Sequence, residues 1–246
     1  RAPARGERGA ARARRGMNAM ATLPLRRHQI AWLNDAGWRG IQARNWDAVA
    51  RDCLAHWAAK RLPLVVTRQA GNARDNAISL GLPAPCRWDR RRLAISVARR
   101  DVLYFDEFPL AEKALALVPA PARTAWRGLC SRLKDAGVGA RVYGSYGWQL
   151  LSGLDHVRTG SDIDLWLSVS DAHQADAAAA CLQSFSSESL RLDGELMFGD
   201  GTAVAWREWL AWRAGRVKSL LVKAIAGSSL AHSPDRRAAA EMAEAA

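Results

Sequence analysis

The fold of this chain is decided by the stretch Ser161-Asp162-Ile163-Asp164-Leu165-Trp166-Leu167. Apolar and polar residues alternate along it, which predicts a strand over 162–169 with one buried face. Asp162 and Asp164 would share the opposite face, about 6–7 Å apart. Two such carboxylates can hold a hard cation such as Mg²⁺, which prefers oxygen ligands and also binds substrate phosphates. A solvent-exposed strand that carries two acids is the alternative interpretation.

Gly144-Ser145 is the second informative motif. It follows an expected strand at 141–143 and precedes an expected helix at 145–151. Backbone N–H groups at a helix N-terminus attract phosphate, and a glycine lets the phosphate approach the chain closely. The Ser145 hydroxyl adds one more donor. Taken alone, Gly-Ser is far more typical of an ordinary turn with an N-cap, so its meaning depends on the acidic strand that follows.

The rest of the chain interleaves strands with helices. In the first half we expect a helix capped by Asn45 over 45–61, a break at 81–85, and strands at 28–33, 64–66, 77–80 and 92–97. Residues 110–124 contain two prolines and are expected to form a linker. The second half adds expected helices at 126–133, 171–185 and 207–226, and a hairpin that joins strands at 190–198 and 202–206. This order predicts an α+β fold of mixed α/β character.

Composition and charge restrict the function. The 246 residues carry 36 Lys and Arg against 24 Asp and Glu, a net charge of +12. This excess suits a polyanionic partner, such as a phosphate-rich ligand or a nucleic acid, and also a solvated basic surface without a specific partner. The cysteines at 53, 86, 130 and 181 have no metal-binding or redox spacing, which favours reduced thiols in the cytoplasm. We expect no membrane span, because no run of about 18 apolar residues occurs.

The order of strand, Gly-Ser, helix and Asp-x-Asp strand resembles the signature of the polymerase-β-like nucleotidyltransferase superfamily. Further segments resemble one family within it, the phosphoribosyl-dephospho-CoA transferase of malonate decarboxylase, also called holo-acyl-carrier-protein synthase. These segments are Arg27-His28, 63–69, 80–83, 141–149, 192–196 and 204–209. The resemblance implies a small N-terminal α/β domain over 25–115 and a C-terminal nucleotidyltransferase-like sheet, with helices packed on it, over 120–230. The Arg- and Ala-rich residues 1–20 and the tail 233–246 are expected to be disordered.

The resemblance also implies a reaction. The substrate would be 2′-(5″-triphosphoribosyl)-3′-dephospho-CoA, and a serine hydroxyl of the apo acyl carrier subunit of malonate decarboxylase would attack its α-phosphorus. A phosphodiester-linked prosthetic group would form, and pyrophosphate would leave. Positioning and charge neutralisation would supply most of the catalysis. Neither a membrane nor a nucleic acid is expected as a partner.

The same resemblance implies roles for the site residues. Asp162 and Asp164 would hold Mg²⁺, or Mn²⁺ in its place. The Gly144-Ser145 turn would bind the β- and γ-phosphates. Members of the superfamily usually have a third carboxylate on a neighbouring strand, and Asp193 and Glu195 are both candidates for this catalytic role, as a base or as a ligand of a second metal ion. Both lie on one face by strand alternation, so the sequence does not decide between them.

Several basic residues are weaker candidates. Arg68 follows the expected strand at 64–66 and could bind a substrate phosphate, as could Lys218 and Lys223 on the expected last helix. A solvated surface position explains Arg68 equally well and explains the two lysines better. His28 is expected to be a structural histidine rather than a base.

Two other functions share parts of this pattern. A different metal-dependent nucleotidyltransferase, acting on a small molecule or an RNA end, would have the Gly-Ser and Asp-x-Asp motifs without the first-half segments. A non-catalytic basic RNA-binding module would leave the acids without a role. The aromatic and basic run expected of such a module is absent from the sequence.

Overall fold

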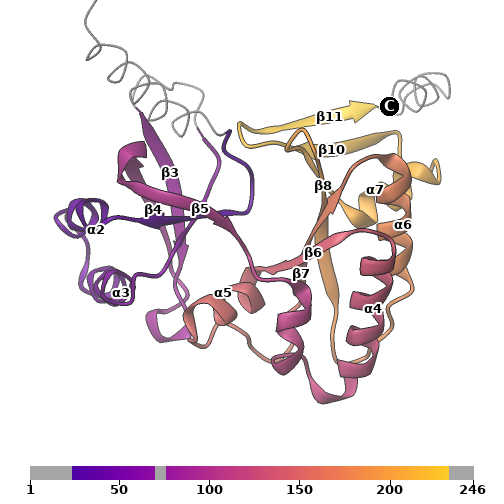
Figure 1. Cartoon of the computed structure of the whole chain (residues 1–246), viewed down its shortest axis with the longest axis horizontal. Coiled ribbons are helices and arrows are strands. Elements are labelled where there is room, and N and C mark those ends of the chain that lie inside the picture. Colours follow the sequence, from indigo (N-terminus) through magenta and orange to yellow (C-terminus); the bar gives the residue numbers. More distant parts are fainter. Residues whose placement is uncertain (1–23, 70–75, 233–246) are drawn as a thin grey trace, which may run out of the picture.

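The computed structural model describes residues 24–69 and 76–232. These residues form two β-sheets that lie side by side, each with helices on its outer side (Figure 1). The mixed α+β fold predicted from the sequence is confirmed. The expected extension 1–20 and tail 233–246 lie outside the described residues.

The sheet of the N-terminal half is antiparallel and has the strand order β4-β3-β2-β1-β5. Its strands are β1 (Gln29–Leu33), β2 (Leu64–Val66), β3 (Ala77–Pro83), β4 (Arg92–Ala98) and β5 (Val102–Glu107). Two helices pack on it and bury Trp38, Leu54 and Trp57 in its core. They are α2 (Asp35–Gln42) and α3 (Ala48–Ala59).

The sheet of the C-terminal half has the order β11-β10-β9-β8-β7-β6. Its strands are β6 (Gly139–Tyr143), β7 (Ile163–Val169), β8 (Leu192–Phe198), β9 (Ala203–Ala205), β10 (Ser219–Lys223) and β11 (Ser228–His232). The pair β7 and β8 is parallel, and the other pairs described for this sheet are antiparallel. Its outer face is covered by α4 (Arg123–Asp135), α6 (Ala172–Gln183) and α7 (Trp206–Arg213) (Figure 1).

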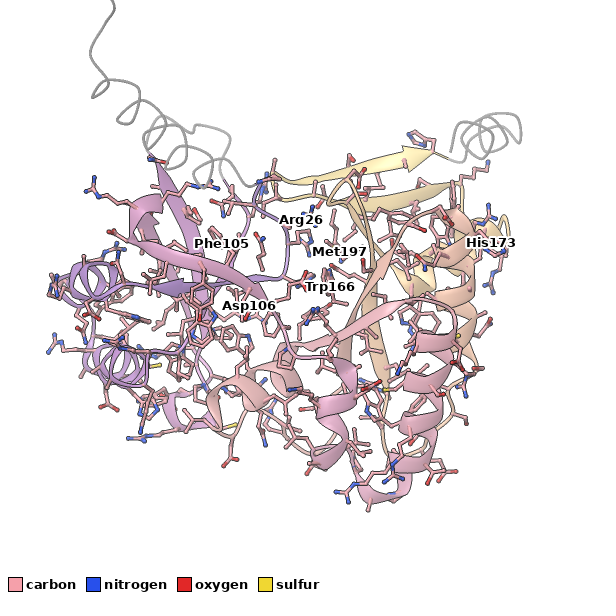
Figure 2. The ribbon with its side chains drawn as sticks, in the orientation of Figure 1. Arg26, Phe105, Asp106, Trp166, His173 and Met197 are labelled. Atoms are coloured by element: carbon pink, nitrogen blue, oxygen red, sulfur yellow. The ribbon has the colours of Figure 1, made fainter. Side chains whose placement is uncertain are left out.

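The alternation predicted for the acidic strand is confirmed in β7. Ile163, Leu165 and Leu167 are fully buried in the core beneath the helices. Trp166 belongs to the opposite face, which is turned toward the N-terminal half. Figure 2 shows Trp166 and Met197 of this sheet in the region between the two sheets, where Arg26 of the first half also lies. The polar face of β7 is therefore the face on which the two halves meet.

Helix α5 (Gly144–Ser152) is anchored in the core of the other half. Its Trp148 is buried among the apolar residues of the N-terminal half and packs edge-on against Phe108, with 5.4 Å between the ring centroids. The ring of His156 is stacked near that of Trp148, with 6.4 Å between the centroids. Burial lowers the pKa of His156 to about 4, and the nearby charge of Arg90 contributes to the same shift. The helix that begins with Gly144 is therefore held by residues of both halves.

The expectation of a linker over 110–124 is wrong. This segment forms two 3-10 helices, Ala111–Ala116 and Ala120–Ala122, that pack into the core of the C-terminal half. Ala114 and Ala122 are fully buried. The prolines bend the chain along this core, because their fixed φ fits the turns between short helices. The two cores therefore meet near residue 109.

The helix predicted over 207–226 is also wrong. Helix α7 ends at Arg213, Gly215 adopts φ +70°, and the chain then returns as β10, paired with β11. Smaller differences concern the first half: Asp47 rather than Asn45 caps α3, and β3 continues through Pro83. Helix α2 and strand β5 were not predicted from the sequence.

Two further expectations concern the oxidation state of the cysteines and the presence of a membrane-spanning helix. All four cysteines are free, and burial raises the pKa of Cys53 to about 12 and that of Cys130 to about 11. Among the described residues, no helix is both long and apolar enough to cross a bilayer.

Candidate active site

The Gly-Ser turn and the acidic strand meet where β6 ends. Tyr143 pairs with Asp164 in the antiparallel β6–β7 ladder, and Gly144 then turns the chain into α5 with φ +58°. A Cβ at Gly144 would overlap Oδ2 of Asp164 and lie 2.8 Å from its Cγ. Glycine fits here without displacing the carboxylate, whereas an added methyl group would occupy the place of Oδ2. The start of α5 therefore rests directly on Asp164, and Ser145 is the next residue along.

Asp193 lies beside Asp164, because the parallel register of β7 and β8 pairs these two residues. One Asp193 carboxylate oxygen accepts a hydrogen bond of 2.8 Å from the N–H of Gly194. Burial raises the pKa of Asp164 to about 6, and the negative charges of Asp193, Asp162 and Glu195 act in the same direction. Like charges held together in a partly buried site are the arrangement that a bound cation relieves.

Asp162 lies directly before β7 and is engaged elsewhere. Both of its carboxylate oxygens accept hydrogen bonds from Arg191, at 2.7 and 2.9 Å. Among residues 24–69 and 76–232, no three His, Cys, Asp or Glu side chains are arranged to hold a metal ion directly. The oxygen donors that Mg²⁺ prefers are present on Asp164 and Asp193. The carboxylate of Asp162 is already paired with Arg191, so it is the less available of the three acids.

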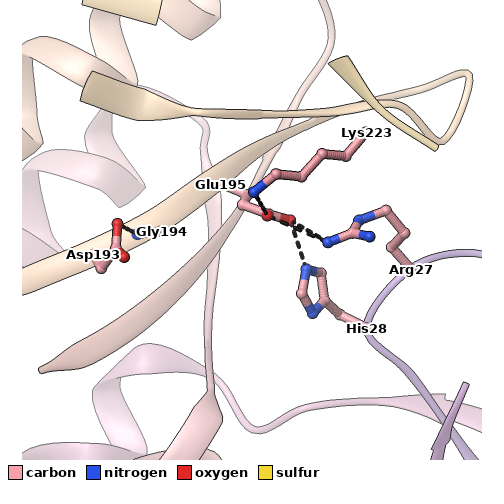
Figure 3. Close-up of polar contacts among 6 residues, drawn as sticks. All are labelled: Arg27, His28, Asp193, Gly194, Glu195 and Lys223. Atoms are coloured by element: carbon pink, nitrogen blue, oxygen red, sulfur yellow. Dashed lines mark hydrogen bonds and ion pairs between the residues drawn. The ribbon is translucent and has the colours of Figure 1, made fainter. Parts of the chain in front are cut away.

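Glu195 lies in a different environment from Asp193. It is 5% exposed and accepts hydrogen bonds from Arg27 at 3.2 Å and from Lys223 at 2.7 Å, while the Nε2 of His28 lies 2.8 Å away (Figure 3). Burial alone would raise the pKa of Glu195, but the contacts with His28, Lys223 and Arg27 hold this pKa well below its usual range. Glu195 is therefore a poor base. We call these four residues the Glu195 cluster.

His28 also touches the start of the Gly-Ser turn. Its ring centroid lies 4.2 Å from that of Tyr143, the residue before Gly144. Burial and the charges of the neighbouring carboxylates raise the pKa of Tyr143. His28 adopts φ +59°, which is uncommon for a residue with a side chain. Its contacts with Glu195 and Tyr143 agree with the structural role predicted for it.

Arg68 and Lys218 do not contact Asp164 or Asp193 in the structure. Arg68 is exposed, and its Nε donates a 3.0 Å hydrogen bond to the carbonyl of Ala226, in the turn between β10 and β11. Lys218 is exposed and lies directly before β10, not on the predicted helix. Lys223 is five residues further on, about 16 Å along the strand and on its other face.

Comparison with known proteins gives the family. Residues 26–108 match the family model described as phosphoribosyl-dephospho-CoA transferase MdcG N-terminal domain, and residues 109–234 match that of the C-terminal domain. The chain belongs to this family. The resemblance stated from the sequence motifs is thereby confirmed, and the chain is a transferase.

Curated phosphoribosyl-dephospho-CoA transferases align with most of the chain. The protein of Bradyrhizobium diazoefficiens is 36% identical over 208 residues, which cover 82% of this chain and 88% of the relative. That of Xanthomonas euvesicatoria pv. vesicatoria is 31% identical over 199 residues, 80% of this chain and 89% of the relative. That of Pseudomonas aeruginosa is 32% identical over 152 residues, 61% of this chain and 70% of the relative. The search of solved structures found no significant match.

In this phosphoribosyl-dephospho-CoA transferase family member, the boundary between the two matched domains falls where the two cores meet. Phe108 packs in the first core and Ala111 in the second. The residue that sequence reasoning missed is Arg27, which reaches Glu195 across 168 positions of the chain. The sequence did contain a signal for Arg27. Glu195 lies on a strand expected to be largely buried, and a buried carboxylate requires cationic partners.

Proposed function

We propose that this protein transfers the phosphoribosyl-dephospho-CoA group from 2′-(5″-triphosphoribosyl)-3′-dephospho-CoA to a serine of the apo acyl carrier subunit of malonate decarboxylase. The name shared by the relatives supports the identity of the transferred group. The contact of Gly144 with Asp164 carries the proposal, because it joins a helix start suited to phosphate with a pair of carboxylates suited to a cation. The four free cysteines support a cytoplasmic location.

The proposed step is a substitution at the α-phosphorus. The serine oxygen of the carrier forms a bond to this phosphorus, the bond to the bridging oxygen breaks, and pyrophosphate leaves with the electron pair. Backbone N–H groups at the start of α5 and the Ser145 hydroxyl are placed to bind phosphate oxygens. The serine proton passes to solvent. Asp193, rather than Glu195, is the candidate for the third carboxylate, because Arg27, His28 and Lys223 hold Glu195 and make it a weak base.

The carboxylates of this site suit Mg²⁺ or Mn²⁺. Asp164 and Asp193 would hold the ion, and Asp162, which pairs with Arg191, would be a further ligand. The ion would neutralise charge on the triphosphate and lower the barrier to departure of pyrophosphate. The raised pKa of Asp164 agrees with a site whose carboxylates repel one another until a cation binds.

Intact-mass spectrometry of the apo acyl carrier subunit tests this function. The subunit is incubated with the protein, triphosphoribosyl-dephospho-CoA and Mg²⁺, with and without EDTA. We expect a mass gain equal to the phosphoribosyl-dephospho-CoA group, lost with EDTA and in Asp164→Asn. Glu188→Gln, which removes an exposed acid from the loop between α6 and β8, should retain the gain. No gain from the folded protein, with a carrier that another preparation can modify, would refute the proposal.

A further inference from the structure

The Glu195 cluster carries more positive than negative charge. Glu195 supplies one negative charge, and Arg27 and Lys223 supply one positive charge each, with His28 adding another when it is protonated. The Glu195 side chain is 7% exposed, whereas those of Arg27 and Lys223 are 27% and 29% exposed. The buried carboxylate therefore neutralises only part of the charge of two cations that solvent and solutes can reach.

Both cations also keep unused hydrogen-bond donors. A lysine ammonium has three N–H donors and an arginine guanidinium has five. Within the described residues, Lys223 donates to Glu195 alone, and Arg27 uses only Nη2 for the same carboxylate. The Nε of Arg27 is buried and has no partner in the described part of the chain. A buried donor of this kind is satisfied when an acceptor binds beside it.

The cluster adjoins the carboxylate pair. Asp193 and Glu195 are two residues apart on β8, about 6–7 Å along the strand. Figure 3 shows Lys223 reaching Glu195 from β10 and Arg27 reaching it from the segment before β1. Asp164 pairs with Asp193 across β7 and β8, so the cluster and the carboxylate pair lie on the same face of the sheet. A pair of acids suited to a cation thus lies next to a pair of cations suited to an anion.

We infer that Arg27 and Lys223 bind the outer phosphates of the substrate's triphosphate, and that Glu195 is a positioning residue that holds both cations for this purpose. This inference rests on the proposed function, which supplies the triphosphate. A polyphosphate fits because it offers a row of charged oxygens to a metal ion at one end and to Arg and Lys donors at the other. The N-terminal half thereby contributes a substrate-binding residue.

Binding of inorganic tripolyphosphate to the full-length protein tests the inference. Isothermal titration calorimetry in the presence of Mg²⁺ should show that Arg27→Gln and Lys223→Gln each weaken binding about 10- to 100-fold, as expected for a lost hydrogen bond between charged groups. The matched variants Arg127→Gln and Lys134→Gln remove exposed charges from α4, on the outer face of the C-terminal sheet, and should bind as the wild type does. Wild-type affinity in Arg27→Gln and Lys223→Gln would overturn the inference.

A second measurement avoids variants that fail to fold. Acetic anhydride acetylates accessible lysines of the wild-type protein, and peptide mass spectrometry gives the rate at each position. Tripolyphosphate with Mg²⁺ should slow acetylation of Lys223 and leave Lys134 unaffected. The same rate at Lys223 with and without tripolyphosphate would show that the cluster is only a structural contact between the halves.

The two proposals fail in different ways. If the wild type does not modify the carrier but tripolyphosphate binding depends on Arg27 and Lys223, the subsite stands and the proposed reaction is rejected. If the wild type modifies the carrier and the variants bind tripolyphosphate normally, the reaction stands and the subsite is rejected. In the expected case, the variants raise the KM for the triphosphate substrate and leave the KM for the carrier unchanged.

Discussion

Replacing Gly144 by alanine probes the contact on which the site is built. The new Cβ would take the position of Asp164 Oδ2 and lie 2.8 Å from Cγ. The backbone of β7 cannot move away easily, because it is paired with β6 on one side and β8 on the other. The carboxylate of Asp164 must therefore rotate or shift, and the distance from the start of α5 to the carboxylate pair must change.

The expected effects follow from these displacements. A side chain in the left-handed region, here φ +58°, costs roughly 1–2 kcal/mol of stability. Misplacement of a catalytic group by about 1 Å costs on the order of 10²-fold in rate. Gly144→Ala should therefore lower the initial rate of carrier modification about 100-fold while the protein remains folded.

Gly153 provides a matched control at the other end of the same helix. It also has a positive φ, +70°, but a Cβ there meets nothing within 4 Å. Gly153→Ala should lower the free energy of unfolding, measured with urea, by a similar amount. Its rate of carrier modification in the intact-mass assay should stay close to that of the wild type. A rate for Gly144→Ala within about tenfold of the wild type, or an equal loss of rate in Gly153→Ala, would refute the reasoning.

Three further predictions concern single side chains. Asp193→Asn should abolish carrier modification and leave the circular dichroism spectrum unchanged; wild-type rates would remove Asp193 from the site. Glu195→Ala should lower the free energy of unfolding by about 1.5–3 kcal/mol, the range for hydrogen bonds to a charged group, because Arg27 and Lys223 lose the carboxylate but stay partly in solvent. A loss under about 1 kcal/mol, the value of an exposed ion pair, would show that the Glu195 cluster does not stabilise the fold in this way. The pKa of His156 is lowered from 6.5 to about 4. Between these two pH values, His156 binds a proton in the unfolded chain but not in the folded chain. The free energy of unfolding should therefore fall by up to about 3 kcal/mol as the pH drops from 6.5 to about 4. His156→Gln should remove this part of the pH dependence of stability. If the pH dependence of stability is the same in His156→Gln, His156 is not its cause.

The carboxylate strand and the Gly-Ser turn could be predicted because their signals are local. Alternation along β7 is a property of seven consecutive residues, and the burial of Ile163 and Leu165 matches it. The prediction of a helix over 207–226 was wrong because the apolar residues between 217 and 225 fit the periodicity of a strand as well as that of a helix. Gly215 marks the end of α7, but only the pairing with β11 shows that a strand follows.

The missed elements have no such local signal. Helix α2 has eight residues, of which Gly37 and Gly40 are poor helix formers, and it is stabilised by packing of Trp38. A Cβ at Gly37 would lie 3.0 Å from the Cβ of Asp101, so a larger residue there would press on Asp101. Strand β5 lies at a sheet edge and has an exposed Leu103, so it shows no clear alternation.

The choice between Asp193 and Glu195 depends on contacts that are distant in sequence. Strand alternation treats the two acids alike. Their difference arises because Arg27 and His28 reach Glu195, and not Asp193, from the segment before β1, more than 160 positions away. Helical periodicity also misplaced Lys223, whose contact with Glu195 requires the strand geometry of β10.

The packing of Trp148 on Phe108 has a consequence for protein engineering. The two matched family domains look like interchangeable modules, yet the helix that begins the proposed phosphate site takes its apolar support from the first domain. A C-terminal fragment produced alone would leave Trp148 in water and release the far end of α5. Chimeras between relatives should therefore exchange Phe108 and Trp148 together, so that each hybrid inherits a matched pair rather than a single domain.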